Sequence, residues 1–411
     1  MRRPSPWLML VVLALGILLA REPRFADAEE MFLGWMMRYS EAKGPAVPLT
    51  VVEIGADPLM TTPDAPPTQP GTAPINASGA AITPLEFALY LQSVLDFQPG
   101  VVAFENVLKW RERDKAQEQV FLDQAMRVPT LLLAAELGVS ADPDAPWTEI
   151  GGFTQVTGRR GDLAPFPGIA RQPNEDLRLI STAGFVNLPE EISSGLRVPL
   201  LFLLRGEVVP SFALQAIMLW QRATPAEVKI VLGSHITLPK GRQIPIRTDG
   251  TMLIHPNAAR RARHLTLNEL LLAAQQRETG KSAELADLKD QIVLARTPAN
   301  PFSPPDVFAA TIATIQGNQY LRRVSAIFDY ALLVVIAVVA GFLRRVDRFD
   351  LLLGGIAATA AYCLVALGLL ARWSLWVPGV LPLTAIWAAV FFALFFPRKP
   401  EATVGVPPPI F

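Results

Sequence analysis

Charged residues stand where the buried strands expected from this sequence end. Glu53 ends one apolar run and Asp57 follows it, Glu105 and Glu136 end or follow two more, and Arg296 ends the last. In open α/β sheets, ligands bind outside the carboxyl ends of the strands. We therefore expect some of these side chains to line a pocket for a small polar ligand. The alternative is a rim of solvated charges.

The sequence contains no recognisable catalytic or metal-binding motif. The three histidines, His235, His255 and His264, are not spaced as a zinc pair. There is no Gly-x-Ser-x-Gly elbow and no phosphate-binding loop. Ser211 stands at an expected helix start, where a serine usually caps the helix. We expect no catalytic residue, no metal site and no cofactor, so the chain is not predicted to be an enzyme.

The elements that would position a ligand site alternate between strand and helix in the first half of the chain. The apolar runs Leu49–Ile54, Val101–Phe104 and Thr130–Ala134 are typical of buried strands. Helical patterns over Thr83–Leu95 and Asp114–Met126 separate these runs. This order predicts a sheet with a parallel core.

The second half has more strands that are separated only by turns, so we expect a mixed sheet and an α/β domain. The expected strands are Leu177–Val186, Arg197–Leu204, Lys229–Leu232, Gln243–Ile246, Met252–Ile254 and Gln291–Ala295, and the expected helices are Pro210–Trp220, Leu265–Gln275 and Pro305–Gly317. Pro58–Ile82 and Gly138–Pro173 are predicted to be long loops.

Four apolar runs at the two ends of the chain predict membrane helices. A hydrocarbon core of roughly 30 Å needs about 20 apolar residues in a helix. Three C-terminal runs satisfy this requirement, Val324–Leu343, Leu351–Ala371 and Leu375–Phe396. The alternative, three buried core helices, leaves nothing to cover them. The shorter run Trp7–Ala20 fits an uncleaved anchor or a signal peptide.

Charge predicts how these helices are oriented and which partners the chain lacks. The short basic link over residues 344–348 should be cytoplasmic, which places residues 21–323 outside. The 411-residue chain has no net formal charge and no basic stripe, so a nucleic-acid partner is not expected. Its single cysteine, Cys363, excludes an intrachain disulfide.

Several motifs in a fixed order resemble one family. They are the acidic turn and the strand with Gly195-Leu196-Arg197 over residues 188–200, Pro210–Leu214, the hairpin over residues 238–250 and Asp290–Leu294. On these residues the chain is similar to the CHASE2 family of extracytoplasmic sensor domains, over roughly residues 25–396. The family's Asp-rich turn after the first strand is reduced here to Gly55-Ala56-Asp57.

The resemblance implies an order of segments along the chain. Residues 1–24 would form an N-terminal membrane anchor or signal segment, and residues 25–323 an extracytoplasmic α/β sensor domain. Residues 324–396 would form three transmembrane helices, and residues 397–411 a short cytoplasmic tail. The fold class expected is therefore an α/β domain with a mixed sheet plus one N-terminal and three C-terminal membrane helices.

The resemblance also implies signal reception at the cytoplasmic, or inner, membrane. We expect a multi-pass protein whose outer domain binds an unknown small ligand and which signals through a separate partner, because no fused output domain is expected. The expected ligand-binding residues are Glu53, Asp57, Glu105 and Arg197, the last of which belongs to the family motif but could simply pair with an acidic residue at the turn. The alternative functions are an envelope assembly or structural factor and an uncharacterised envelope enzyme.

Overall fold

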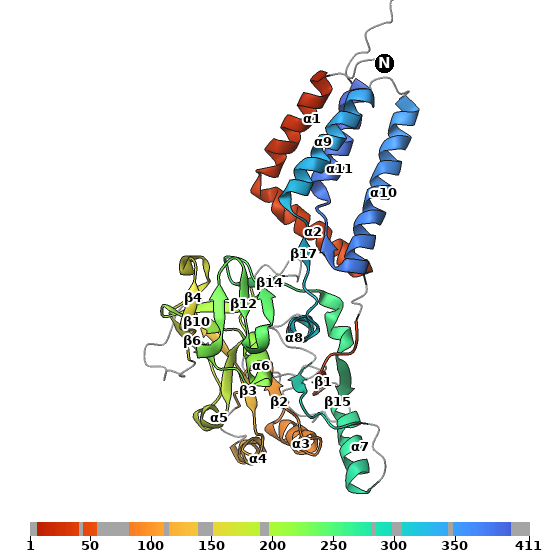
Figure 1. Cartoon of the computed structure of the whole chain (residues 1–411). Helices are drawn as coiled ribbons and strands as arrows, with labels where there is room; N and C mark the ends of the chain where they lie inside the picture. Colours follow the sequence, from red (N-terminus) through yellow and green to blue (C-terminus); the bar gives the residue numbers. More distant parts are fainter. Residues whose placement is uncertain are drawn as a thin grey trace, which may run out of the picture. The chain divides into compact units, whose positions relative to one another are not determined.

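The chain forms two compact units, which are described separately (Figure 1). The computed structural model describes residues 6–40, 44–55, 82–110, 115–138, 151–189, 197–280, 285–297, 306–343 and 348–395. Residues 41–321 form an α/β unit, and residues 1–40 together with 322–411 form a helical unit.

A seven-stranded sheet forms the centre of the α/β unit. Its strands are β1 (Leu49–Glu53), β2 (Val101–Phe104), β3 (Leu131–Gly138), β6 (Gly168–Arg171), β7 (Thr182–Phe185), β15 (Arg263–Thr266) and β16 (Ile292–Arg296). The order is β15-β1-β16-β2-β3-β6, and β7 also pairs with β3. All pairs are parallel except β3 with β6, so the expected α/β class with a mixed sheet is confirmed.

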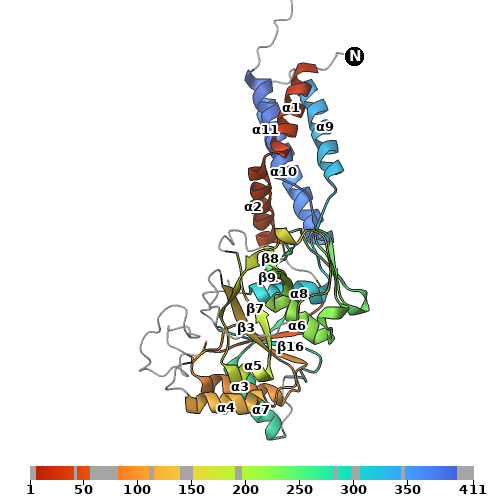
Figure 2. The same ribbon diagram turned by 90° about the vertical axis from the view of Figure 1, so that its left-hand side faces the viewer.

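Helices cover both faces of this sheet (Figure 2). One face is covered by α3 (Pro84–Leu95), α4 (Lys115–Ala125), α5 (Glu175–Ile180) and α7 (Leu267–Glu278), and the other by α6 (Phe212–Gln221) and α8 (Val307–Gly317). On the first face Phe87 and Phe121 pack in one buried cluster. On the second, the rings of Phe212 and Phe308 are 5.2 Å apart. The α/β unit is thus a three-layer structure with a core on each side of the sheet.

Short strands and turns extend the second core. Three small sheets contain β10-β9-β5, β13-β12-β11-β4 and β14-β8. Their strands are β4 (Gln155–Thr157), β5 (Pro165–Phe166), β8 (Arg197–Pro199), β9 (Leu201–Leu204), β10 (Glu207–Pro210), β11 (Lys229–Val231), β12 (His235–Thr237), β13 (Gln243–Pro245) and β14 (Thr251–Leu253), with the 3-10 helices η3 (Arg160–Asp162), η4 (Pro225–Glu227), η5 (Pro239–Gly241) and η6 (Pro256–Arg261).

Two local predictions are wrong in the described residues. The expected strand Leu177–Val186 begins as helix α5, because Glu175 and Asp176 place negative charge in the first helical turn, where it stabilises a helix. The expected loop Gly138–Pro173 contains β4, η3, β5 and β6. Most of the other expected loop lies outside the described residues.

The helical unit contains the apolar segments. It comprises α1 (Pro6–Ala20), α2 (Pro23–Tyr39), β17 (Arg322–Arg323), α9 (Ala326–Leu343), α10 (Arg348–Trp373), β18 (Leu375–Trp376) and α11 (Val380–Phe395). Within the described part of the chain, α10 is the one helix both long and apolar enough to cross a membrane, whereas α1, α9 and α11 are shorter apolar helices.

The last apolar run is not helical throughout. Leu375 and Trp376 form a strand that pairs with β17, and the helix begins only at Val380. Pro378 has no N–H, and a residue before proline disfavours the helical conformation, so the helix starts after it.

Small side chains bring the helices of this unit close together. Ala337 and Ala340 of α9 are buried in one cluster with Ala385 and Ala389 of α11. Small residues let helix backbones approach closely, which increases the dispersion contact between the two helices.

Truncating Phe104 tests the core between the sheet and α3/α4. Its buried ring makes edge contacts with Phe87, Tyr90 and Phe121 at 5.4–5.8 Å. Phe104→Ala should destabilise the α/β unit by about 3–5 kcal/mol, because such a truncation removes buried area and leaves a cavity. The melting temperature should therefore fall by roughly 5 °C or more in a thermal unfolding scan. Leu179→Ala is the matched control, because Leu179 is 81% exposed; an equal shift in both variants would contradict this packing.

Candidate functional site

The carboxyl ends of three parallel strands meet at one edge of the main sheet. β1 lies between β15 and β16, and in this register Glu53 is the neighbour of Thr266 on one side and of Arg296 on the other. Each of these three residues is the last of its strand. Residues from both halves of the unit's sequence therefore gather at one edge.

The chain leaves these strands in opposite directions. After β16 it enters α8, whose buried side chains belong to the core on the α6 side. After β1 and β15 it enters α3 and α7, whose buried side chains belong to the opposite core. Such a divergence between neighbouring parallel strands opens a crevice outside their carboxyl ends, which is where ligands bind in open α/β sheets.

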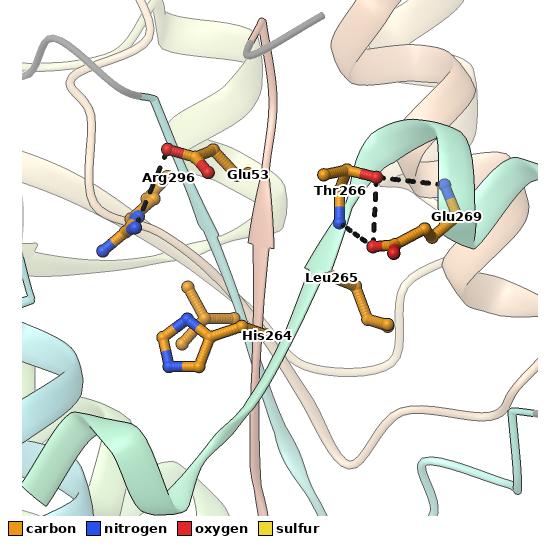
Figure 3. Close-up of a pocket in the computed structure, with 7 residues that line it drawn as sticks. Glu53, His264, Leu265, Thr266, Glu269 and Arg296 are labelled. Atoms are coloured by element: carbon orange, nitrogen blue, oxygen red, sulfur yellow. Dashed lines mark hydrogen bonds and ion pairs between the residues drawn. The ribbon is translucent and has the colours of Figure 1, made fainter.

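A cavity of about 110 Å³ lies at this place (Figure 3). Its lining residues come from β1, β15, β16 and the first turn of α7: Val51, Glu53, His264, Leu265, Thr266, Glu269 and Arg296. Val51 and His264 are register neighbours, as are Glu53 and Arg296. Because side chains alternate along a strand, these four lie on the same face of the sheet.

Arg296 contacts two carboxylates. Its Nη2 lies 3.7 Å from Oε1 of Glu53, and its Nη1 donates a closer hydrogen bond to Asp306, just before α8. The Arg296 side chain is 15% exposed, whereas those of Glu53 and Asp306 are about one-third exposed. The arginine therefore has its charge compensated, chiefly by Asp306, while Glu53 has only the longer ion pair.

His264 and Glu269 border the same cavity with defined hydrogen bonds. Nε2 of His264 lies 2.9 Å from the carbonyl oxygen of Ala259, so this nitrogen carries a proton and donates to that oxygen. Oε2 of Glu269 accepts from the N–H and the hydroxyl of Thr266 at 2.7 and 3.1 Å, and Thr266 Oγ1 accepts from the Glu269 N–H. This is a capping box at the start of α7.

The four predicted ligand-binding residues are not all brought together. Glu53 lines the cavity, whereas Glu105, which follows β2, is buried and does not line it. Arg197 lies in β8, opposite Leu253 of β14 in a separate small sheet. Asp57 lies outside the described residues. Of the other charges at strand ends, Arg296 lines the cavity and Glu136 pairs with Arg171.

A buried hydrogen bond fixes the strand ends next to the cavity. Nδ2 of Asn106 donates to Oγ1 of Thr297 at 3.0 Å, and both side chains are buried. The N–H of Glu105 donates to the carbonyl oxygen of Ala295. These bonds hold the chain after β2 against the chain after β16, and so position Arg296.

Sequence reasoning missed His264, Thr266 and Glu269 as residues of this site. β15 has only four residues, and its polar sequence gives no strand signal. The Thr266-x-x-Glu269 pattern was the available signal, since it predicts a helix N-terminus. This pattern predicts that the helix starts after residue 266. The residues before it could then have been assigned to a strand.

The three histidines lie apart from any metal-binding group in the described residues. His235 is in β12, His264 in β15, and His255 precedes η6, where its Nδ1 accepts from the N–H of Asn257 at 3.2 Å. No group of three or more His, Cys, Asp or Glu side chains suited to a metal occurs among the residues described.

The fold and the cavity define a class: an α/β domain with a ligand-sized opening at its sheet edge, in a chain that also carries apolar helices. The family model of the CHASE2 domain matches residues 9–340. The chain therefore belongs to the CHASE2 family, a family of membrane-associated extracytoplasmic sensory domains. No curated protein and no solved structure matches it significantly.

His255 should make stability depend on pH. Burial lowers its pKa from 6.5 to about 4. Between pH 6.5 and 4 the His255 imidazole is mostly protonated in the unfolded chain and mostly neutral in the folded chain. The free energy of unfolding should therefore fall as pH decreases from 6.5 to 4 and then level off. His255→Asn keeps a side-chain acceptor for the Asn257 N–H and removes the titration. Thermal unfolding at several pH values should show a smaller slope for His255→Asn, and the wild-type slope for the control Leu179→Ala, which changes an exposed side chain that carries no titratable group. An unchanged slope in His255→Asn would refute this assignment.

Proposed function

We propose that this chain is a multi-pass sensory protein of the cytoplasmic membrane whose α/β unit lies outside, binds a small ligand at the carboxyl edge of its sheet, and signals to a separate partner protein. Membership of the CHASE2 family supports the sensory role and the extracytoplasmic placement. The cavity bordered by Glu53, His264 and Arg296 carries the ligand-binding part of the proposal.

The proposed membrane arrangement has four spans, α1, α9, α10 and α11. Their outward side chains support it, because large apolar residues are exposed on each of the four, including Leu18, Val335, Leu364 and Phe391. Large apolar side chains exposed along four helices are favourable in hydrocarbon and unfavourable in water. The basic sequence between α9 and α10 supports a cytoplasmic position for that link.

A contact network in the helical unit supports a signalling route. The chain enters the α/β unit after α2 and leaves it at β17. Glu29 of α2 is buried and accepts from the N–H groups of Gly379 and Leu381, at 2.7 and 2.9 Å. These donors lie at the start of α11, where N–H groups have no partner within the helix and a carboxylate is favoured.

The second connection reaches the same stretch of chain. The N–H of Arg322, in β17, donates to the carbonyl oxygen of Ser374, and the N–H of Val324, just after β17, donates to that of Trp376. The guanidinium of Arg323 lies 5.4 Å from the Trp376 ring centroid. Both chain connections therefore hold residues 374–381, which lead into α11. We propose that ligand-linked movement of the α/β unit reaches the membrane helices through this segment.

Cysteine labelling tests the proposed topology. In a Cys363→Ser background, Gln119→Cys places one thiol on the exposed surface of α4, and Asp350→Cys places one at the exposed start of α10. A membrane-impermeant maleimide should label Gln119→Cys in intact spheroplasts and Asp350→Cys only in inverted vesicles. Labelling of Asp350→Cys but not Gln119→Cys in spheroplasts would overturn the proposed orientation.

Removing the Glu29 carboxylate tests the contact between α2 and α11. Hydrogen bonds to charged groups contribute about 1.5–3 kcal/mol, and 1.4 kcal/mol corresponds to a tenfold change in an equilibrium. Glu29→Ala should therefore raise amide hydrogen exchange at Gly379 and Leu381 by about tenfold or more. Asp27→Ala, an exposed position on the same helix, is the control. Wild-type protection of both amides in Glu29→Ala would show that the carboxylate does not hold α11.

A further inference from the structure

The helix α2 carries a row of large apolar side chains on its outer side. Met31, Trp35 and Tyr39 follow one another at intervals of four residues, so they lie along one side of the helix. These residues are 69%, 49% and 67% exposed. The ring of Trp35 stacks on that of Phe32 at 5.9 Å between centroids and meets that of Tyr39 edge-on at 5.3 Å. We call Met31, Trp35 and Tyr39 the α2 stripe.

The polarity of α2 is opposite to that of a helix that borders water. On the side opposite the α2 stripe, Glu29 and Glu30 are buried, and Glu29 accepts from the first N–H groups of α11. Three apolar residues are buried on that side as well, Leu33, Met36 and Met37. A surface helix in water buries its apolar residues and exposes its charges. Exposed aromatic rings opposite buried carboxylates therefore indicate that the medium outside α2 is apolar.

The composition of α2 is that of an interfacial helix and not of a membrane span. Its 17 residues include five charged ones, and it is much less apolar overall than α1. A helix of low overall hydrophobicity with one apolar face lies in the membrane interface, with that face about 5–10 Å inside the boundary between headgroups and acyl chains. Trp and Tyr are enriched at this depth, because each ring combines an apolar body with a polar group.

The length of α1 explains why α2 meets lipid. α1 has 15 residues and is about 22 Å long, whereas the hydrocarbon core is roughly 30 Å thick. α2 begins at Pro23, after a two-residue link that follows Ala20. The chain therefore reaches α2 before it has left the apolar layer completely. The last turn of α1 exposes Ile17 and Leu18, so the α2 stripe continues an apolar surface that begins on α1.

Contacts with α11 hold α2 at the end of the helical unit. The ring of Phe32 lies so close to Gly379 that a Cβ at that position would overlap it, and only a glycine fits there. The carboxylate of Glu29 binds the N–H of the same glycine. α2 thus lies across the end of the unit at which α11 begins (Figure 1). These contacts leave the α2 stripe on the outer side.

We propose that α2 is an interfacial helix whose stripe, Met31, Trp35 and Tyr39, binds the lipid of the outer leaflet between headgroups and acyl chains. The inference goes beyond the proposed function and rests on the membrane arrangement given there. α2 ends at Tyr39, directly before the α/β unit. An α2 bound to lipid therefore holds the entry of the chain into that unit at the membrane surface.

Spin labels measure the depth of the α2 stripe in a bilayer. In a Cys363→Ser background, a nitroxide is attached to Met31→Cys or Tyr39→Cys, which leave Trp35 in place. The full chain is reconstituted in vesicles of phosphatidylethanolamine and phosphatidylglycerol. Collision of the nitroxide with oxygen, which partitions into hydrocarbon, is compared with its collision with a water-soluble nickel chelate. Both labels should lie about 5–10 Å inside the bilayer surface.

Two exposed positions outside α2 calibrate the measurement. Leu364→Cys, on the apolar helix α10, is the lipid reference, and Gln119→Cys, on α4, is the water reference. The labels on the α2 stripe should be shallower than the label at Leu364→Cys and much less accessible to the nickel chelate than the label at Gln119→Cys.

Two results would overturn the inference. One is accessibility to the nickel chelate at Met31→Cys and Tyr39→Cys equal to that at Gln119→Cys. The other is strong dipolar broadening between labels at Met31→Cys that disappears on dilution with unlabelled chain, because a second copy would then cover the α2 stripe. Failure of the proposed membrane arrangement is recognised separately, by a label at Leu364→Cys that is open to the chelate.

Discussion

The α/β unit depends on the pairing of β16 along both of its edges. This strand comes from the end of the unit's sequence, yet it lies between β1 and β2 and forms parallel ladders with both. Its residues Ile292 to Ala295 are almost completely buried, so its backbone N–H and C=O groups must find partners within the sheet. The first strands therefore cannot complete the sheet until the last part of the unit is present.

The central position of β16 also produces the cavity. Because β16 leads to α8 on one face, and β1 and β15 lead to helices on the other, the chain diverges at their carboxyl ends. The charged residues Glu53 and Arg296 end two strands whose other residues are all buried. Their ion pair and the contact of Arg296 with Asp306 satisfy charges that would otherwise be unfavourable so close to the core.

In the helical unit, polar contacts concentrate at one level. Glu29 binds the first N–H groups of α11, β17 pairs with β18, and Arg323 lies against Trp376 and pairs with Asp329 at 3.1 Å. Away from this level the helices contact one another through alanine and other small or branched side chains. The polar contacts thus lie where both chain connections enter the unit, and the apolar contacts lie along the helices.

The sequence by itself determined the features that depend on local patterns. Apolar runs predicted β1, β2 and the apolar helices, Pro84 marked the first turn of α3, and charges at strand ends indicated the edge where the cavity lies. Only the tertiary structure decided that β16 lies between β1 and β2, that β15 forms the edge strand beside β1, and that Arg197 belongs to another sheet. The order of the strands depends on distant segments of the chain. These segments provide the hydrogen-bond partners for the backbone of each strand and the surfaces that bury its side chains. Local sequence does not encode that choice, so Glu53 and Arg296 could be predicted at the edge, whereas the contributions of His264 and Glu269 to the cavity could not.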